Sequence, residues 1–163
     1  GPKILLKLVK EKNLVEGLAD RELTTPEGAG FDLRLGELYE FQGGRAFLGE
    51  YERETPGMKL IGDFLIATTI EKVNTPLDIT INFKPRTTTF RSGLFLRTGN
   101  VAPGYCGKLT FAIKNAGPMP VTLEMGCRIV HAQFEWVDGG GNQYRGQWQG
   151  GRVTTGSKRE KQI

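Results

Sequence analysis

The sequence lacks long hydrophobic runs, and this absence excludes a membrane-spanning helix. Its longest apolar stretches, such as Phe64-Leu65-Ile66-Ala67, are far shorter than the roughly 20 residues that a helix needs to cross a bilayer. The beginning of the chain also lacks the apolar segment of a secretory signal, because Lys7 and Lys10 interrupt it. We therefore expect an intracellular, cytoplasmic protein with no membrane partner.

Cysteine and histidine are scarce as well. The chain contains only Cys106, Cys127 and His131, whereas zinc sites in proteins usually need three or four Cys and His ligands. This scarcity excludes the zinc-dependent class of deaminases. Any metal ion would have to be held by oxygen atoms.

Carboxylates are missing from one long segment. No Asp or Glu occurs between Asp78 and Glu124, although basic residues are frequent there. The imbalance predicts that the segment binds an anion. The alternative is that the basic side chains occupy solvated positions on strands, which we prefer for Lys108 and Lys114. The basic residues of the segment are Lys84, Arg86, Arg91, Arg97, Lys108 and Lys114.

The overall composition is that of a single domain rich in turns, spanning 1–163. With 163 residues, 38% hydrophobic and 25% charged, the chain is long and apolar enough for one core. A net charge of +4 is too small to indicate a nucleic-acid partner. The 23 glycines and 8 prolines favour short strands joined by tight turns over a helical bundle.

Apolar spacing predicts one helix followed by a series of strands. Helical intervals in the stretch from Ile4 to Leu23 predict a short helix that stops at Gly17, within an N-terminal lead-in, 1–27. The polar segment 139–163 cannot contribute to a core and is expected to be a flexible lid or tail. The strands between them predict a mostly β fold, a compact β-barrel or jelly roll. They are Phe31–Leu35, Glu37–Phe41, Lys59–Thr68, Ile79–Phe83, Gly93–Arg97, Gly107–Asn115, Val121–Leu123 and Cys127–Val137.

Three segments carry residues suited to a nucleotide. In Pro85–Leu94, two arginines bracket three threonines, a pattern that suits phosphate but also fits a β-branched strand. In Thr98–Gly107, three glycines surround Tyr105, whose ring could stack on a sugar or base, or close one end of the barrel. In Tyr144–Gly156, aromatic, amide and arginine side chains alternate with glycine, as in a lid over a bound nucleotide or in a disordered terminus.

Taken in order, these segments resemble motifs of the family that contains trimeric dUTPases and zinc-independent dCTP deaminases. The resemblance extends from Gly30 to Lys158, and the form of the tail is closer to dCTP deaminases and to the archaeal dUTPases built like them. The matching segments are Gly30–Gly36 for the first motif, Arg86–Leu94 for the phosphate loop, Pro103–Asn115 for the nucleoside hairpin and its strand, Gly126–Ile129 for the fourth motif, and Tyr144–Gly150 for the tail.

The resemblance implies a fold, an assembly and a set of site residues. The fold would be a distorted jelly-roll barrel with a short N-terminal helix, assembled as a homotrimer with active sites between subunits. Mg²⁺ would accompany the triphosphate. The implied phosphate-binding residues are Arg86, Thr87, Thr88 and Arg91; the nucleoside-binding residues are Asn100, Val101 and Tyr105; the lid residues are Tyr144, Gln147, Gln149, Arg152 and Thr154.

Two positions depart from the family pattern. Ala112 stands where the deaminases carry a glutamate that handles protons, and Ala102 stands where dUTPases carry the aspartate that activates water. General acid–base chemistry needs a titratable group at the reacting atom, so alanine cannot replace either. A substitute base could be Asp32, Glu124, a group of another subunit, or His131. His131 could also donate to phosphate or simply be an edge residue of a strand.

These observations support three hypotheses. The first is a dUTPase-like hydrolase that converts dUTP to dUMP and pyrophosphate with Mg²⁺. The second, supported by Ala102 and Ala112, is a catalytically silent member of the family that binds a nucleotide or a protein partner. The third and weakest is a dCTP deaminase. All three make a deoxynucleoside triphosphate the expected ligand, with dUTP preferred, dCTP next and no nucleic acid.

Overall fold

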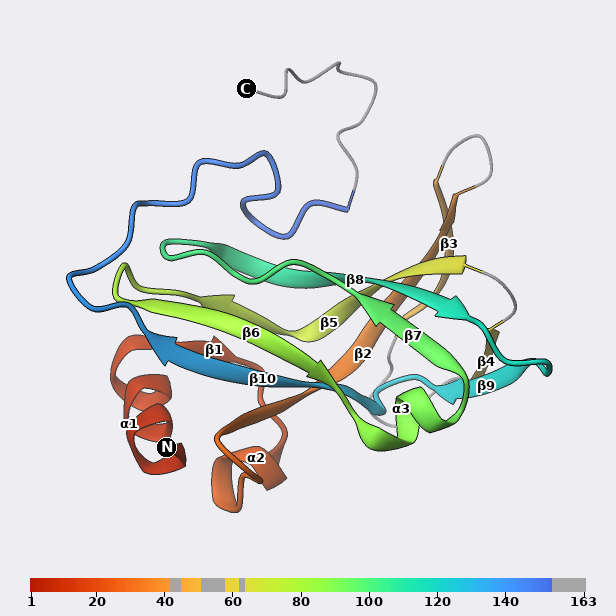
Figure 1. The fold of residues 1–163 in the computed structure, drawn as a ribbon, viewed down its shortest axis with the longest axis horizontal. Helices are drawn as coiled ribbons and strands as arrows, with labels where there is room; N and C mark the ends of the chain where they lie inside the picture. Colours follow the sequence, from red (N-terminus) through yellow and green to blue (C-terminus); the bar gives the residue numbers. More distant parts are fainter. Residues whose placement is uncertain (42–44, 51–57, 62–63, 154–163) are drawn as a thin grey trace.

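Antiparallel strands and a few short helices make up the chain in a computed structural model that describes residues 1–41, 45–50, 58–61 and 64–153 (Figure 1). No helix within these ranges is long and apolar enough to cross a bilayer. The elements are α1 (Pro2–Lys12), β1 (Val15–Glu16), α2 (Asp20–Thr24), β2 (Gly30–Phe41), β3 (Arg45–Glu50), β4 (Met58–Ile61), β5 (Phe64–Asn74), β6 (Ile79–Pro85), α3 (Thr87–Arg91), β7 (Leu94–Arg97), β8 (Cys106–Asn115), β9 (Val121–Glu124) and β10 (Arg128–Trp136).

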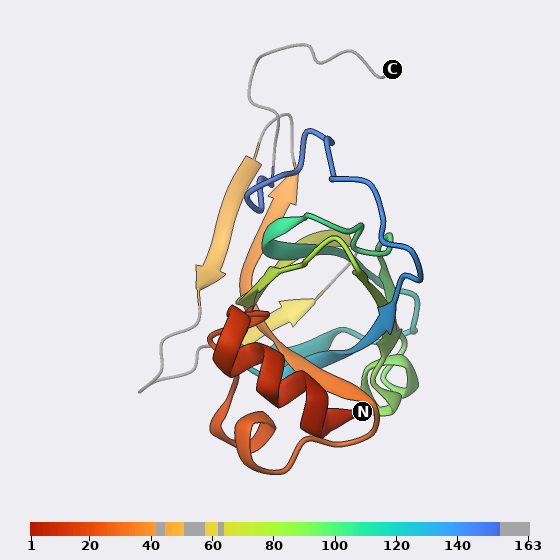
Figure 2. The ribbon, with the colours of Figure 1, turned by 90° about the vertical axis from the view of Figure 1, so that its left-hand side faces the viewer.

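The main sheet curls into a nearly closed barrel, which Figure 2 shows end on. Its strand order is β6-β10-β2-β5-β8-β7, with β1 added to β5 and β3 added to β2, while β4 and β9 form a separate pair. Along β8, buried and less buried residues alternate, as expected for a strand with one face toward a core. The barrel interior is filled by large apolar side chains, among them Phe31, Leu33, Leu38, Phe111 and Ile113. This arrangement confirms the expected β-barrel with a short N-terminal helix.

The N-terminal helix is shorter than the expected one. It ends at Lys12, because Asn13 adopts a left-handed conformation (φ 53°) that stops the helix. The apolar positions that follow are not part of a helical stripe. Leu14 and Val15 are buried, and Val15 pairs with Val73 of β5, so these residues extend the sheet instead.

Two strand predictions also differ from the structure. The expected strand Lys59–Thr68 is two strands, β4 and β5, and β5 continues to Asn74. The expected strands Phe31–Leu35 and Glu37–Phe41 form one strand, β2, whose register shifts between Leu35 and Glu37. A bulge of this kind keeps the strand continuous while it bends around the barrel.

The threonine-rich segment is the short helix α3, not a strand. Thr89 is buried, and its hydroxyl donates to the Ile129 carbonyl at 3.2 Å. This anchor fixes one face of α3 to the start of β10 and leaves its other residues at the surface. The β propensity of threonine is therefore overridden by a tertiary contact.

Candidate functional site

The α3 segment presents its polar residues at one end of the barrel. Thr87, Thr88 and Arg91 are exposed, and Arg86 lies half-buried at the position that precedes the helix. Exposed hydroxyls and guanidinium groups supply the donors that phosphate oxygens accept. The four residues that the sequence assigns to phosphate are therefore together in the structure, on one short element.

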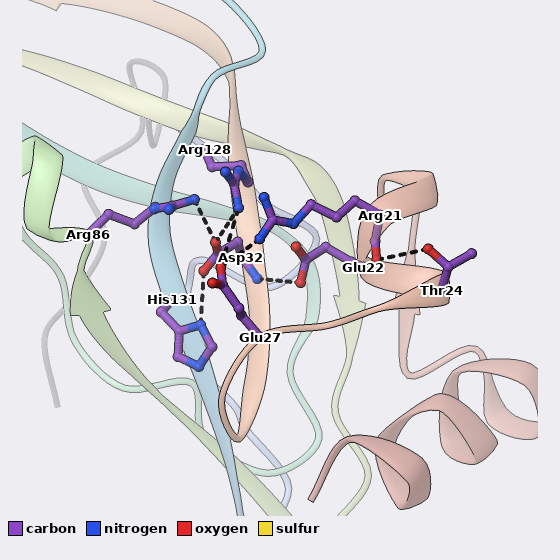
Figure 3. Close-up of polar contacts among 8 residues, drawn as sticks. All are labelled: Arg21, Glu22, Thr24, Glu27, Asp32, Arg86, Arg128 and His131. Carbon is purple, nitrogen blue, oxygen red and sulfur yellow. Dashed lines mark hydrogen bonds and ion pairs between the residues drawn. The ribbon is translucent and has the colours of Figure 1, made fainter.

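Arg86 also belongs to a charged cluster centred on Asp32 of β2, drawn in Figure 3. The Arg86 Nη1 and Arg128 Nη1 atoms lie 2.6 and 3.0 Å from Asp32 Oδ2. His131 Nδ1 lies 2.9 Å from the other carboxylate oxygen, Oδ1. The side chain of Asp32 is only 5% exposed, so one buried carboxylate holds three side chains, two from β10 and one from the turn before α3.

Acidic residues complete the surroundings of Asp32. The Asp32 backbone N–H donates to Glu22 Oε2 at 3.0 Å, and Glu22 is fully buried. Arg128 lies 3.8 Å from Glu27, which also pairs with Arg21 at 2.7 Å (Figure 3). Each of the three guanidinium groups of the cluster contacts a carboxylate. Glu22 has no ion pair with them in the described part of the chain, and its Oε1 atom has no hydrogen-bond partner there.

A cavity of about 430 Å³ lies beside the segment between β7 and β8, which we call the hairpin loop (98–105). β5 and β8 contribute Ile66, Leu109 and Thr110 to its lining, and the C-terminal segment 144–153 contributes residues on another side. The side chains and backbone around it are largely apolar, as in pockets that bind small organic molecules. The lining residues are Ile66, Thr98, Gly99, Asn100, Val101, Ala102, Tyr105, Leu109, Thr110, Tyr144, Trp148, Arg152 and Val153.

The C-terminal segment is hydrogen-bonded to the hairpin loop. The Gln149 side chain accepts from the Cys106 N–H at 2.9 Å and donates to the Gly104 carbonyl at 3.0 Å. The Gly150 N–H donates to the Cys106 carbonyl at 2.7 Å. A Cβ atom at Gly107 would lie 2.4 Å from the Gly151 nitrogen, so only glycine permits this close approach.

The predicted lid residues have different roles in this contact. Tyr144, Trp148 and Arg152 line the cavity, and Gln149 fastens the segment to the hairpin loop. Gln147 accepts a hydrogen bond from Arg152 through its backbone carbonyl at 3.0 Å. Thr154 lies outside the described residues. The sequence did not single out Trp148, although it stands between Gln147 and Gln149.

Tyr105 presents its ring to the cavity and uses its hydroxyl elsewhere. The hydroxyl donates to the Lys108 carbonyl at 2.7 Å, and the ring contacts Tyr144 edge-on with centroids 5.4 Å apart. Burial raises the pKa of Tyr105 to about 12, so the hydroxyl stays protonated at neutral pH. Tyr105 can therefore pack against a sugar but cannot act as a base there.

The cavity contains no carboxylate or imidazole among the residues that the structure describes around it. Ala102 lines it, and Ala112 lies farther along the same face of β8, opposite Ile66 and Arg97 on the neighbouring strands. Both alanines therefore lie at or near the cavity, where the family residues would act. The cavity can bind a nucleoside, but its own side chains cannot transfer protons to or from a base.

The phosphate segment and the cavity are not together in one chain. The helix α3 precedes β7 and the hairpin loop follows it, so the two lie at opposite ends of that strand (Figure 1). The four residues of β7 span about 13 Å. Asn100, Val101 and Tyr105 are thus brought together with the C-terminal segment, and Arg86, Thr87, Thr88 and Arg91 with the Asp32 cluster.

Comparisons with known proteins show the family to which the chain belongs. Residues 3–137 match a family model described as dCTP deaminase-like. The chain is 31% identical over 154 residues to a dCTP deaminase of Pyrococcus furiosus, covering 94% of this chain and 95% of that protein. It is 30% identical over 149 residues to a dUMP-forming dCTP deaminase of Dictyoglomus turgidum, covering 81% of this chain and 77% of that protein.

Two solved structures share the barrel. A 2′-deoxycytidine 5′-triphosphate deaminase from Agrobacterium tumefaciens superposes with a TM-score of 0.62 at 20% identity, covering 82% of this chain and 46% of that one. The EIAV dUTPase superposes with a TM-score of 0.51 at 18% identity, covering 82% of this chain and 92% of that one. At these identities the likeness concerns the fold.

Proposed function

We propose that this chain, which belongs to the dCTP deaminase-like family, binds a 2′-deoxynucleoside triphosphate and hydrolyses it to the monophosphate and pyrophosphate. Membership of the family confirms the resemblance given by the ordered motifs. The substrate that we propose is dUTP, and the reaction is attack of water on the α-phosphorus.

One observation carries this proposal: a largely apolar cavity closed by the chain's own C-terminal segment, with no carboxylate or imidazole in its described lining. Such a cavity suits the nucleoside part of a substrate, with Tyr105 against the deoxyribose and the hairpin backbone at the base. It does not suit chemistry on the base. Deamination needs a group that moves protons at the ring, and Ala112 cannot supply one.

The remaining chemistry belongs at the phosphate segment. Arg86, Arg91 and the hydroxyls of Thr87 and Thr88 are suited to hold the triphosphate and to stabilise charge that develops on its oxygens. No group of three or more His, Cys, Asp or Glu side chains in the described ranges could hold a metal ion. We therefore propose that Mg²⁺ is bound with the triphosphate, mostly by phosphate and water oxygens.

The separation of cavity and phosphate segment supports a site between subunits. A triphosphate bound at α3 of one chain needs a nucleoside cavity that its own hairpin loop does not place there. A neighbouring chain can provide that cavity, so we propose that the active form is a homotrimer with composite sites.

The alternative is a catalytically silent member that binds the nucleotide or a protein partner. It is favoured by Ala102 and Ala112, which remove both family carboxylates from the hairpin loop and β8. The two functions share the same binding residues. They differ only in whether a base is available at the phosphate end.

The experiment that tests the proposal is a product analysis of four nucleotides. The purified protein is incubated with Mg²⁺ and dUTP, dCTP, dTTP or UTP, and the products are separated by anion exchange. We expect dUMP and pyrophosphate from dUTP and no reaction with UTP. No turnover at stoichiometric protein would favour the silent member, and a deaminated product from dCTP would overturn the argument from Ala112.

A further inference from the structure

We propose that His131, oriented by Asp32, is the base that takes the proton from the attacking water. This inference rests on the proposed hydrolysis and supplies the group that Ala102 leaves missing. It assigns different roles to the two residues: His131 would be catalytic, and Asp32 would be a positioning residue.

Asp32 cannot easily be the base itself. Its side chain is almost fully buried, its Oδ2 atom accepts from two guanidinium groups, and its Oδ1 atom faces His131. Taking a proton would weaken these contacts to a carboxylate that is only 5% exposed. The geometry instead fits a carboxylate that fixes the orientation and tautomer of an imidazole.

His131 has one nitrogen held and the other free. An ionised carboxylate can only accept hydrogen bonds, so Nδ1 carries the hydrogen that lies on Asp32 Oδ1. The neutral ring then has its lone pair on Nε2, which has no hydrogen-bond partner among the residues that the structure describes. Figure 3 shows this second nitrogen pointing away from Asp32.

Nε2 is reachable from outside the barrel. The His131 side chain is 19% exposed, and Nε2 faces the exposed Gly28 of the loop before β2. A Cβ atom at Gly28 would lie 3.4 Å from Nε2. Because glycine carries no side chain, the loop leaves space beside Nε2 that a larger residue would reduce.

The position of His131 matches the phosphate end of the site. Asp32 links His131 through one oxygen and Arg86 through the other, so the imidazole and the guanidinium assigned to phosphate are tied to the same carboxylate (Figure 3). A phosphate held by Arg86 would therefore lie at the same Asp32 cluster that holds His131. The hairpin cavity, in contrast, contains no titratable group other than Tyr105, Tyr144 and Arg152 in its described lining.

The step balances without another reactant. The water oxygen forms a bond to the α-phosphorus, and the bond from that phosphorus to the bridging oxygen of the pyrophosphate breaks. Nε2 accepts the water proton, so the ring becomes imidazolium. The bridging oxygen leaves with the electron pair, and the ring later returns the proton to solvent or to pyrophosphate. The products are the deoxynucleoside monophosphate and pyrophosphate.

The variant His131→Gln distinguishes between two roles of His131, that of a base and that of a hydrogen-bond donor. The glutamine amide can donate to phosphate but cannot take the proton. We expect kcat for dUTP to fall by about 10² to 10⁴-fold, the range for loss of a general base. KM and the dissociation constant of an α,β-imido analogue of dUTP should stay within about threefold of the wild type. Gln133→Ala, two residues along the same face of β10, is the matched control and should keep the wild-type kcat.

Asp32→Asn tests the positioning role. The amide retains the shape of the carboxylate but no longer fixes the Nδ1–H tautomer, so kcat should fall while analogue binding persists. Thermal unfolding of each variant shows that the barrel remains folded. A lower unfolding temperature of Asp32→Asn would not by itself support the positioning role of Asp32.

The outcomes distinguish this inference from the proposed function. If the wild type hydrolyses dUTP and His131→Gln keeps kcat within about threefold, the base lies elsewhere and only this inference is wrong. If His131→Gln loses analogue binding in proportion to kcat, His131 is a binding residue and the inference is again wrong. If the wild type shows no hydrolysis at all, the proposed function and this inference fail together.

Discussion

At the residue scale, Tyr105 shows how burial sets what a side chain can do. Its ring lines the cavity, its hydroxyl donates to the Lys108 carbonyl, and burial raises its pKa from the ordinary value of 10.0 to about 12. The folded protein therefore retains the tyrosine proton at a pH where the unfolded chain has lost it. This difference makes the stability depend on pH.

Tyr105→Phe tests this account. At pH 8 the variant should be less stable than the wild type by about 1 kcal/mol, because the hydrogen bond is lost. Between pH 10 and about 12 the folded wild type binds more protons than the unfolded chain, so its stability falls as pH rises. The variant has no tyrosine proton to lose at this position, so its stability does not fall for this reason. The gap between the free energies of unfolding of wild type and variant, measured in urea, should therefore shrink above pH 10. A gap that is constant or grows would show that Tyr105 does not titrate as described.

Some residue roles can be predicted from the sequence and others cannot. The threonines of α3 and the aromatic residues of the tail could be assigned to phosphate and nucleoside from their motifs. The role of Arg128 could not, because its pairing with Asp32 spans 96 positions and depends on how β10 aligns with β2. The same register places His131 directly opposite Asp32, and no local pattern reveals it.

At the element scale, the C-terminal segment 144–153 and the hairpin loop act as one unit. Backbone and side-chain hydrogen bonds from Tyr144, Gln149 and Gly150 connect the two. The segment contributes no residue to the fully buried barrel core. Removal of the segment should therefore leave the barrel folded but weaken ligand binding.

Truncation after Gly141 tests this role. The shortened protein should unfold at a temperature close to that of the full chain when no nucleotide is present. We expect dUTP to raise the unfolding temperature of the full chain but not of the shortened protein, because Tyr144, Trp148 and Arg152 no longer cover the cavity. Gln149→Ala, which removes two of the contacts, should give an intermediate shift. Equal stabilisation of truncated and full-length protein would show that the segment is not a lid.

Helices and strands were predictable where the apolar residues follow a single spacing, that of a helix or that of a strand. Strands β6, β7 and β8 were expected close to their observed bounds, since turns with glycine or proline mark their ends. The end of α1 was not, because Leu14 and Val15 continue the apolar spacing while the chain has become extended. Local spacing cannot show that Val15 pairs with a strand far along the chain.

At the scale of the whole molecule, the two halves of the proposed site lie at opposite ends of β7. The Asp32 cluster and α3 form the phosphate end, and the hairpin loop with the C-terminal segment forms the nucleoside end. We propose that the assembly of several chains unites them, as the family resemblance also implies.

Mixing two inactive variants tests the composite site. Arg86→Ala disables the phosphate end, and Ala102→Phe fills the cavity of the nucleoside end, so each variant alone should be inactive. Co-expressed chains should regain about a quarter of the wild-type activity, because random assembly gives that share of sites with one intact half from each variant. Lys114→Ala in place of Arg86→Ala is the control and should be active alone. Mixed chains without activity would place both halves of the site in one chain.

The most direct measurement is the hydrolysis of dUTP by the wild-type protein in water enriched in heavy oxygen, followed by mass spectrometry of both products. Attack of water on the α-phosphorus, with the base at the phosphate end, predicts that the label appears in dUMP and that pyrophosphate carries none. Label in the pyrophosphate, or no dUMP from stoichiometric protein, would contradict the account.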